Sequence, residues 1–204
     1  MKNCPISEKT LNYLYFKNKL SVAEISRKIQ VSENKVSYWM DKYNLKRRSR
    51  SEATYVKRNP TGNPFTKRKG LNHQQIFLKA LGLGFYWGEG TKADKYNVRI
   101  CNSDPKFIQI FLRFLKEIYQ IKEKRLRFAL HLFDDIDPDK AINYWCKELH
   151  LNKRNFLKTQ IIKLNRKGTY IKKSKYGVLT LIFYNKKLRD IINKEIEEIK
   201  SSCS

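Results

Sequence analysis

Acidic residues are scarce in this sequence, and the usual metal-binding spacings are missing. Of 204 residues, 19 are Asp or Glu, against 44 Lys or Arg. The four cysteines and three histidines include no CxxC pair and no HxxxH spacing, which argues against a structural zinc site. Cysteines without such partners are typical of reduced thiols in an intracellular protein.

Long apolar runs are also lacking. Lys79 interrupts the longest one, so no run reaches the roughly 18 residues that a membrane-spanning helix needs. The first residues do not have the pattern of a secretory signal peptide. We therefore expect a cytoplasmic protein with no membrane partner.

The charge balance points to a polyanionic partner. A net charge of +25 and a pI near 10.0 are typical of proteins that bind nucleic acid or an acidic membrane surface. Codon usage rich in A and T would also raise the lysine content, but such codons serve Glu as well, and acids stay scarce. With 41% hydrophobic and 13% aromatic residues, the chain is expected to fold. Together these features favour a folded nucleic-acid-binding protein.

Residues 8–45 are expected to form three short helices. Ser21, with Glu24 three residues later, forms a capping box that begins the second helix, and Ser32 caps the third. Helical spacing predicts one buried stripe on the third helix. That stripe consists of Val36, Trp39, Met40 and Tyr43.

Two capped helices joined by a short turn resemble the helix-turn-helix of DNA-binding proteins. The alternative is a plain three-helix bundle that binds a protein. The polar outer face of the third helix favours DNA, because the second helix of such a pair reads the major groove. We assign residues 1–46 to this module. The residues expected to contact DNA are Asn34, Lys35, Tyr38 and Lys42.

Residues 47–70 are expected to be a basic linker without secondary structure, since Pro60, Gly62 and Pro64 interrupt them. The linker could be a solvated tether. We favour a strap that lies along phosphates and raises the effective concentration of the second module. Its predicted DNA contacts are Arg47, Arg48 and Arg50.

Residues 71–204 alternate between helix and strand, which predicts an α+β domain. We expect a mostly antiparallel sheet with helices on one face and a basic face left open. On the first strand, Val98 and Ile100 should point inward, and Asn97 should point outward. The expected strands are 96–102, 125–133, 156–164 and 176–184, and the expected helices are about 73–88, 104–119, 137–150 and 186–199. The open face is expected to contact a duplex through Arg99, Arg125, Arg127, Lys158 and Lys163.

The first helix of this domain contains Gly82, Gly84 and Gly88, and each glycine costs about 0.5–1 kcal/mol relative to alanine. Ala80, Gly84 and Gly88 are spaced by four and share one stripe, so a second helix could approach closer than the usual 8–10 Å or so. Because Glu89 follows the stripe, two such helices would bring two carboxylates together, and a divalent cation would hold them. We predict a homodimer through this stripe, with Mg²⁺ or Mn²⁺ at Glu89.

The stretch GLGFYWGEG resembles the LAGLIDADG motif of homing endonucleases. Gly84, Gly88, Glu89 and Gly90 align with the glycine, the small residue, the acid and the last glycine of that motif. The resemblance implies a saddle-shaped sheet on DNA, a homodimer, and a catalytic divalent metal held by Glu89 with Gly88. The implied reaction is metal-dependent hydrolysis of both strands of double-stranded DNA.

The sequence departs from that family pattern in three places. Glu89 replaces the commoner Asp, Trp87 stands where the motif often has an inner acid, and an additional helix is expected among the strands. Three functions stay open. A homing endonuclease needs Glu89 and metal, and a transcription regulator with a LAGLIDADG-like domain needs only the recognition helix. An RNA maturase-like protein should prefer structured RNA. We favour the endonuclease.

Overall fold

The fold is α+β. The computed structural model describes residues 5–163 and 174–202, and these form eight α-helices and one four-stranded mixed sheet. The chain divides into two compact units, one ending at Asn63 and one beginning at Pro64. No helix in the described ranges is long and apolar enough to cross a membrane.

The first unit is helical, and its local capping signals are as the sequence predicts. Ser21 and Glu24 form a complete capping box, and Ser32 accepts a hydrogen bond from the backbone N–H of Lys35. The elements are α1 (Glu8–Asn12), the π-helical turn η1 (Tyr13–Lys17), α2 (Val22–Ile29), α3 (Glu33–Lys42) and α4 (Arg50–Arg58). Their small core is built around Leu11, Ile25, Val36 and Met40.

Helix α4 corrects the expectation of a linker without secondary structure. Ser49 and Glu52 form a complete capping box at its start, with a Glu52 carboxylate oxygen 2.8 Å from the Ser49 backbone nitrogen. This signal is present in the sequence, at the same spacing as in the second helix. The basic composition of the segment therefore did not prevent a helix, because the cap satisfies its first free N–H groups.

The second unit begins earlier than residue 71. Phe65 is buried in its core, and the backbone N–H groups of Thr66 and Arg68 donate to the carbonyls of Tyr119 and Ile118. The helices are α5 (His73–Glu89), α6 (Pro105–Tyr119), α7 (Pro138–Leu149) and α8 (Lys186–Ser202). The strands are β1 (Val98–Asn102), β2 (Leu126–Phe133), β3 (Gln160–Ile162) and β4 (Val178–Phe183), with 3₁₀ turns η2 (Glu123–Arg125) and η3 (Lys153–Asn155).

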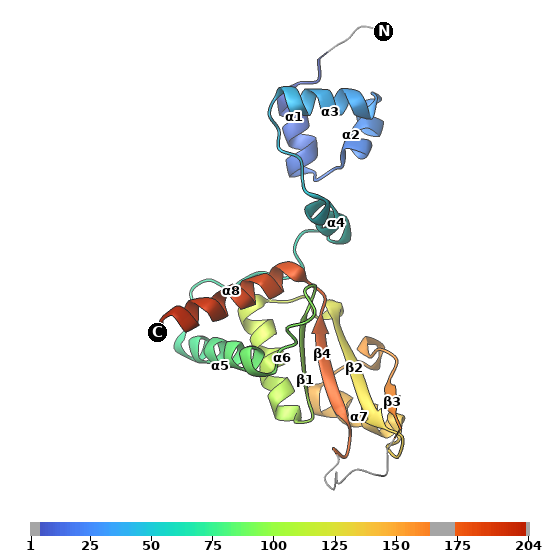
Figure 1. Cartoon of the computed structure of the whole chain (residues 1–204), viewed down its shortest axis with the longest axis vertical. Coiled ribbons are helices and arrows are strands. Elements are labelled where there is room, and N and C mark those ends of the chain that lie inside the picture. Colours follow the sequence, from blue (N-terminus) through green and yellow to red (C-terminus); the bar gives the residue numbers. More distant parts are fainter. Residues whose placement is uncertain (1–4, 164–173, 203–204) are drawn as a thin grey trace. The chain divides into compact units, whose positions relative to one another are not determined.

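The sheet has the order β1-β4-β2-β3 and is mixed, so the expectation of a mostly antiparallel sheet is wrong. The last strand of the chain, β4, lies between β1 and β2 and is antiparallel to both (Figure 1). Strand β3 is parallel to β2, with Gln160 opposite His131. The physical reason is the intervening helix α7, because a helical crossover returns the chain in the same direction.

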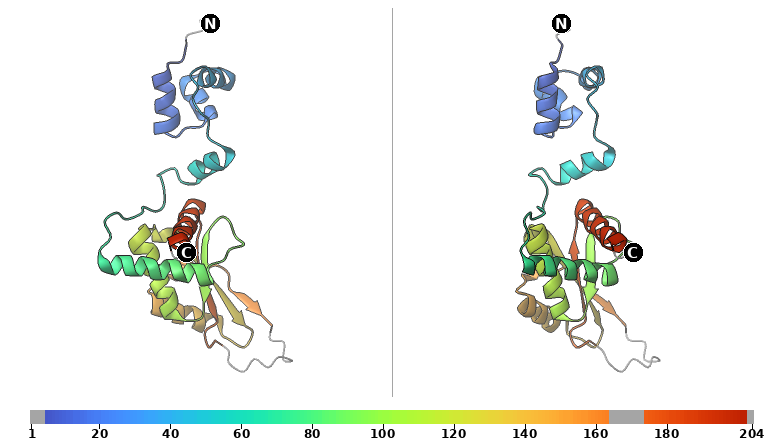
Figure 2. Two further views of the ribbon diagram at one scale, coloured as in Figure 1. Left: turned by 60° about the vertical axis from the view of Figure 1, so that its left-hand side comes forward. Right: turned by 90° about the vertical axis from the view of Figure 1, so that its left-hand side faces the viewer.

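One face of the sheet carries the core of this unit. Ile100 on β1, Phe128 on β2 and Leu181 on β4 are fully buried on that face, and α6 and α7 lie on its side of the sheet (Figure 2). The opposite face, which we call the second face, carries Arg99 and the other alternate residues. Asn97 is 2% exposed, which corrects the expectation that it points outward.

Candidate nucleic-acid interface and the end of helix α5

The inner side of α5 packs against the domain core. Leu78, Leu83 and Tyr86 are buried there, and Gly82 lies directly beneath the ring of Phe114 on α6. A Cβ atom at Gly82 would overlap that ring, so this glycine allows α5 and α6 to approach each other. Sequence reasoning did not assign Gly82 this role.

The outer stripe of α5, Ala80, Gly84 and Gly88, faces away from the core. All three residues are exposed, and a Cβ atom added at Gly84 or Gly88 would meet nothing within 4 Å. Large apolar side chains accompany the stripe, with Phe77 67% exposed and Trp87 50% exposed. Within the described residues, the glycines of this stripe serve no contact of the single chain.

Glu89 is the last residue of α5 and is exposed. Among the described residues, its carboxylate has neither a hydrogen bond nor an ion pair. The described part of the chain also contains no group of three or more His, Cys, Asp or Glu residues that could hold a metal ion. Glu89 and the Gly88 carbonyl offer few of the roughly six oxygens that Mg²⁺ requires. One chain therefore does not complete a metal site at this position.

Lys92 closes the end of α5, a role that sequence reasoning missed. Its ammonium donates to the carbonyls of Tyr86 (2.6 Å) and Trp87 (2.9 Å) in the last helical turn, and the Tyr86 carbonyl also accepts the Gly90 N–H. Burial, and then the nearby charges of Lys200 and Arg189, lower the pKa of Lys92 below its ordinary value. A lysine just beyond a helix end is a readable signal of such a cap.

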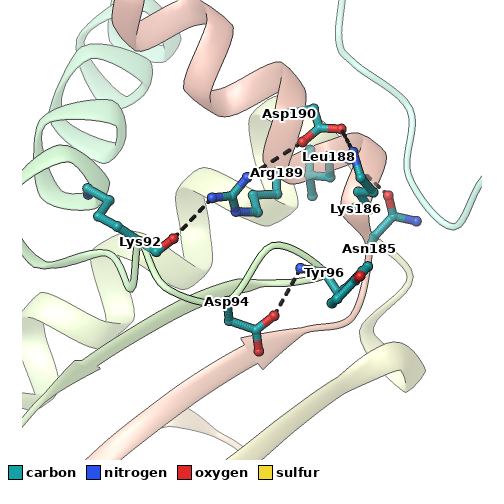
Figure 3. A network of polar contacts seen from close by, with 8 residues as sticks. All are labelled: Lys92, Asp94, Tyr96, Asn185, Lys186, Leu188, Arg189 and Asp190. Atoms are coloured by element: carbon teal, nitrogen blue, oxygen red, sulfur yellow. Dashed lines mark hydrogen bonds and ion pairs between the residues drawn. The ribbon is translucent and has the colours of Figure 1, made fainter.

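The loop that follows Glu89 is fixed by a hydrogen bond from α8 and by polar contacts of Asp94 within the loop and to β1. Figure 3 shows the Arg189 guanidinium, which donates to the Lys92 carbonyl at 3.3 Å. The Asp94 carboxylate accepts the backbone N–H of Tyr96 at 2.9 Å. That hydrogen bond is the largest cause of the lowered pKa of Asp94, and Arg99 adds to it from 4.0 Å. The chain beside Glu89 is thus held to the start of α8.

On the second face of the sheet, two predicted DNA contacts share one row. Arg99 on β1 and Arg127 on β2 both lie opposite Ile182 of β4. Arg127 is held in place, because one of its nitrogens donates to the carbonyls of Lys124 (2.9 Å) and Leu126 (2.7 Å). Arg127 therefore contributes positive charge to this face, whereas Arg99 lies 4.0 Å from the Asp94 carboxylate.

The other three predicted contacts of this domain do not lie on the paired strands of that row. Arg125 lies in η2, just before β2 begins. Lys158 and Lys163 flank the short edge strand β3, and both are exposed. These three residues lie outside the strands, so the alternation of side chains along a strand does not decide which way they face.

In the first unit, the predicted reading residues lie together on α3. Asn34 and Tyr38 are exposed, and Lys35 is partly buried. The Lys42 ammonium lies 4.6 Å from the centre of the Trp39 ring and 6.0 Å from that of Tyr38. The outer face of α3 therefore presents polar, aromatic and cationic groups next to one another.

Of the arginines predicted to contact DNA after α3, Arg48 has a structural role. Its guanidinium stacks 4.1 Å from the Tyr15 ring and donates to the carbonyls of Lys19 (2.9 Å), Tyr15 (2.8 Å) and Leu20 (2.6 Å). These hydrogen bonds satisfy backbone carbonyl groups at the end of the first helical segment.

The neighbouring arginines differ from Arg48. One guanidinium nitrogen of Arg47 donates to both carboxylate oxygens of Asp41, at 2.7 Å to each, and Arg50 is exposed in the first turn of α4. Of the three, Arg50 therefore remains open to an external partner.

Comparisons of the chain with protein-family models, with curated proteins and with solved structures found no match.

Proposed function

We propose that this protein is a sequence-specific, double-stranded-DNA-binding homodimer that cleaves DNA as a divalent-metal-dependent endonuclease of the LAGLIDADG type. The observation that carries the proposal is the outer stripe of α5, whose exposed glycines and aromatic neighbours end directly at the exposed Glu89. Exposed apolar area on a helix, and glycines that serve no contact within the chain, both call for a partner surface.

A homodimer would also resolve the incomplete metal site. Two copies of α5 crossing at their outer stripes would bring two Glu89 carboxylates together, and each would repel the other without a cation between them. DNA phosphates and water would supply the remaining oxygens. Mg²⁺ bound there would activate water and stabilise the leaving oxygen of a phosphodiester.

The DNA contacts in this proposal come from both units. In the first, α3 acts as the recognition helix of a helix-turn-helix, with Asn34, Lys35 and Tyr38 reaching base edges. In the second, the sheet forms a basic saddle on which Arg99 and Arg127 contact the duplex. The support for these roles is the exposure of α3 and the shared row of the two arginines.

The proposal is tested by strand scission. The full-length protein selects duplexes from a random pool in Ca²⁺, and the bound duplexes then receive Mg²⁺. We expect the wild type to cut both strands and Glu89→Gln to bind without cutting. Glu148→Gln, the same change at another exposed acid, is the matched control and should cut like the wild type.

The outcomes separate two functions. Selective binding with no cutting by the wild type would contradict the endonuclease and favour a transcription regulator. One observation already favours this second candidate: the described residues contain no group of three or more His, Cys, Asp or Glu that could hold a metal ion. Failure to select any duplex would contradict both functions.

A further inference from the structure

A hollow of about 340 Å³ lies at the edge of the sheet in the second unit. Its walls come from three places: η2 with the start of β2, the end of α7, and η3. Phe156, just after η3, forms an isolated parallel bridge with Phe128 of β2, and the Leu157 N–H donates to the Phe128 carbonyl at 2.7 Å. These bonds bring η3 beside the start of β2, so backbone pairing holds the walls of the hollow together.

The hollow is lined by positive charge, and no acid of the described part of the chain pairs with it. Lys124, Arg127 and Arg154 line it, together with the imidazole of His150. The one acid in the lining, Glu123, is paired with Lys116 on α6, with 3.1 Å between the charged atoms. In a concave site, like charges focus the electrostatic field and raise the local concentration of anions.

The cations in the hollow are also available to a ligand. Within the described ranges, Arg127 donates to two backbone carbonyls and to no acid, so its charge is held in position without being neutralised there. Among the described residues, the side chains of Lys124 and Arg154 have no hydrogen-bond or ion-pair partner. The Asn152 side chain accepts the Arg154 backbone N–H at 3.0 Å, which fixes the turn that carries Arg154.

We propose that this hollow is a phosphate site that receives a backbone phosphodiester of bound double-stranded DNA. Guanidinium and ammonium groups are the usual partners of phosphate. Arg127 links the hollow to the second face of the sheet, since it belongs to the row that includes Arg99. The site rests on the proposed DNA-binding function and extends the contact surface to η3 and to α7, the additional helix among the strands.

The test is the salt dependence of duplex affinity. Neutralising two phosphate-binding residues, in the double variant Lys124→Gln and Arg154→Gln, should lower the slope of log K against log salt by roughly 0.9 for each DNA phosphate that is no longer neutralised. The control variant carries Lys106→Gln and Lys194→Gln on α6 and α8, two exposed positions with the same change in net charge. We expect the control slope to equal that of the wild type. Equal slopes for the two double variants would overturn the site.

A second measurement separates failure of the site from failure of the proposed function. Inorganic phosphate, titrated into the full-length protein, should shift the NMR signal of the His150 ring in the wild type and not in the Lys124→Gln, Arg154→Gln variant. If the wild type binds no duplex but shows this shift, the hollow is an anion site and the DNA function fails. If neither duplex nor phosphate binds, the phosphate site is wrong.

Discussion

The two sides of α5 use glycine for different purposes. On the inner side, Gly82 lies beneath the Phe114 ring, and its missing Cβ lets two helices of the same chain pack closely. On the outer side, no described residue lies within 4 Å of a Cβ position at Gly84 or Gly88. The first glycine is explained within the single chain, whereas the other two have no explanation there. Glycines two residues apart, such as Gly82 and Gly84, can therefore face different partners. Their spacing alone does not show which partner each one contacts.

The largest expected effect comes from filling the inner side. Gly82→Leu would force its side chain into the Phe114 ring, and overpacking of this kind costs roughly 3 kcal/mol. We expect the unfolding transition of the second unit to move to much lower urea concentration. An unchanged transition would show that α5 and α6 can move apart without cost. It would also mean that the inner and outer glycines of α5 do not differ in their packing role.

A somewhat smaller loss is expected where α5 contacts α8. The buried Glu195 carboxylate of α8 pairs with Lys79 of α5 (3.0 Å) and Lys67 (2.6 Å), and accepts the Tyr119 hydroxyl at 3.0 Å. Glu195→Gln should cost about 2 kcal/mol in urea unfolding at neutral pH, less than a fully buried pair because both lysines are partly exposed. A loss confined to salt-free buffer would mean that the cluster behaves as a surface pair.

The pH dependence of that loss has a definite sign. Burial alone would raise the pKa of Glu195, but hydrogen bonds from Lys67 and Lys79 outweigh it and hold the pKa below the ordinary value of 4.5. The stability from Glu195 is therefore fully present above pH 4.5 and is lost as the pH falls through the lowered value. The difference between wild type and Glu195→Gln should shrink in that acid range. A difference that grows there would contradict the assignment.

Removing the cap at the end of α5 should have a modest effect. Lys92→Met deletes two hydrogen bonds to helix carbonyls and keeps the length of the side chain, for a loss of about 1 kcal/mol. Hydrogen exchange at the Gly90 N–H, which donates to the Tyr86 carbonyl, reports fraying of this last turn directly. Unchanged exchange at Gly90 would mean that Lys92 does not hold the turn.

The smallest effect on folding is expected on the outer side. Gly84→Leu is the same substitution as at Gly82, yet it should leave the unfolding free energy of the monomer unchanged or raise it by about 0.5–1 kcal/mol. The dissociation constant of the dimer should rise by at least about 30-fold, as for a residue at the centre of an interface. Analytical ultracentrifugation measures the dissociation constant of the wild-type dimer and of the Gly84→Leu dimer. A Gly84→Leu dimer as tight as the wild type would contradict the interface at the outer stripe.

Much of the secondary structure could be predicted because its causes are local. The capping box of Ser21 and Glu24 and the Asp104–Pro105 start of α6 involve residues within four positions of each other. The alternation of β2 likewise follows from the direction of successive side chains. The α4 helix escapes prediction although its capping box is readable, because the basic composition and the nearby prolines favour a linker.

The sequence by itself determined the helix starts, the buried faces and the strongly basic charge, since each depends on neighbouring residues or on composition alone. Only the tertiary structure decided what the individual polar and small residues contact. Arg48 donates a hydrogen bond to the Leu20 carbonyl, 28 residues away in the chain, and Gly82 packs against the Phe114 ring of another helix. Such contacts, like the parallel pairing of β3 with β2, depend on which distant segments the fold brings together. No local pattern determines which distant segment a residue contacts. An arginine or a glycine has the same sequence neighbours whether it contacts its own chain or faces outward.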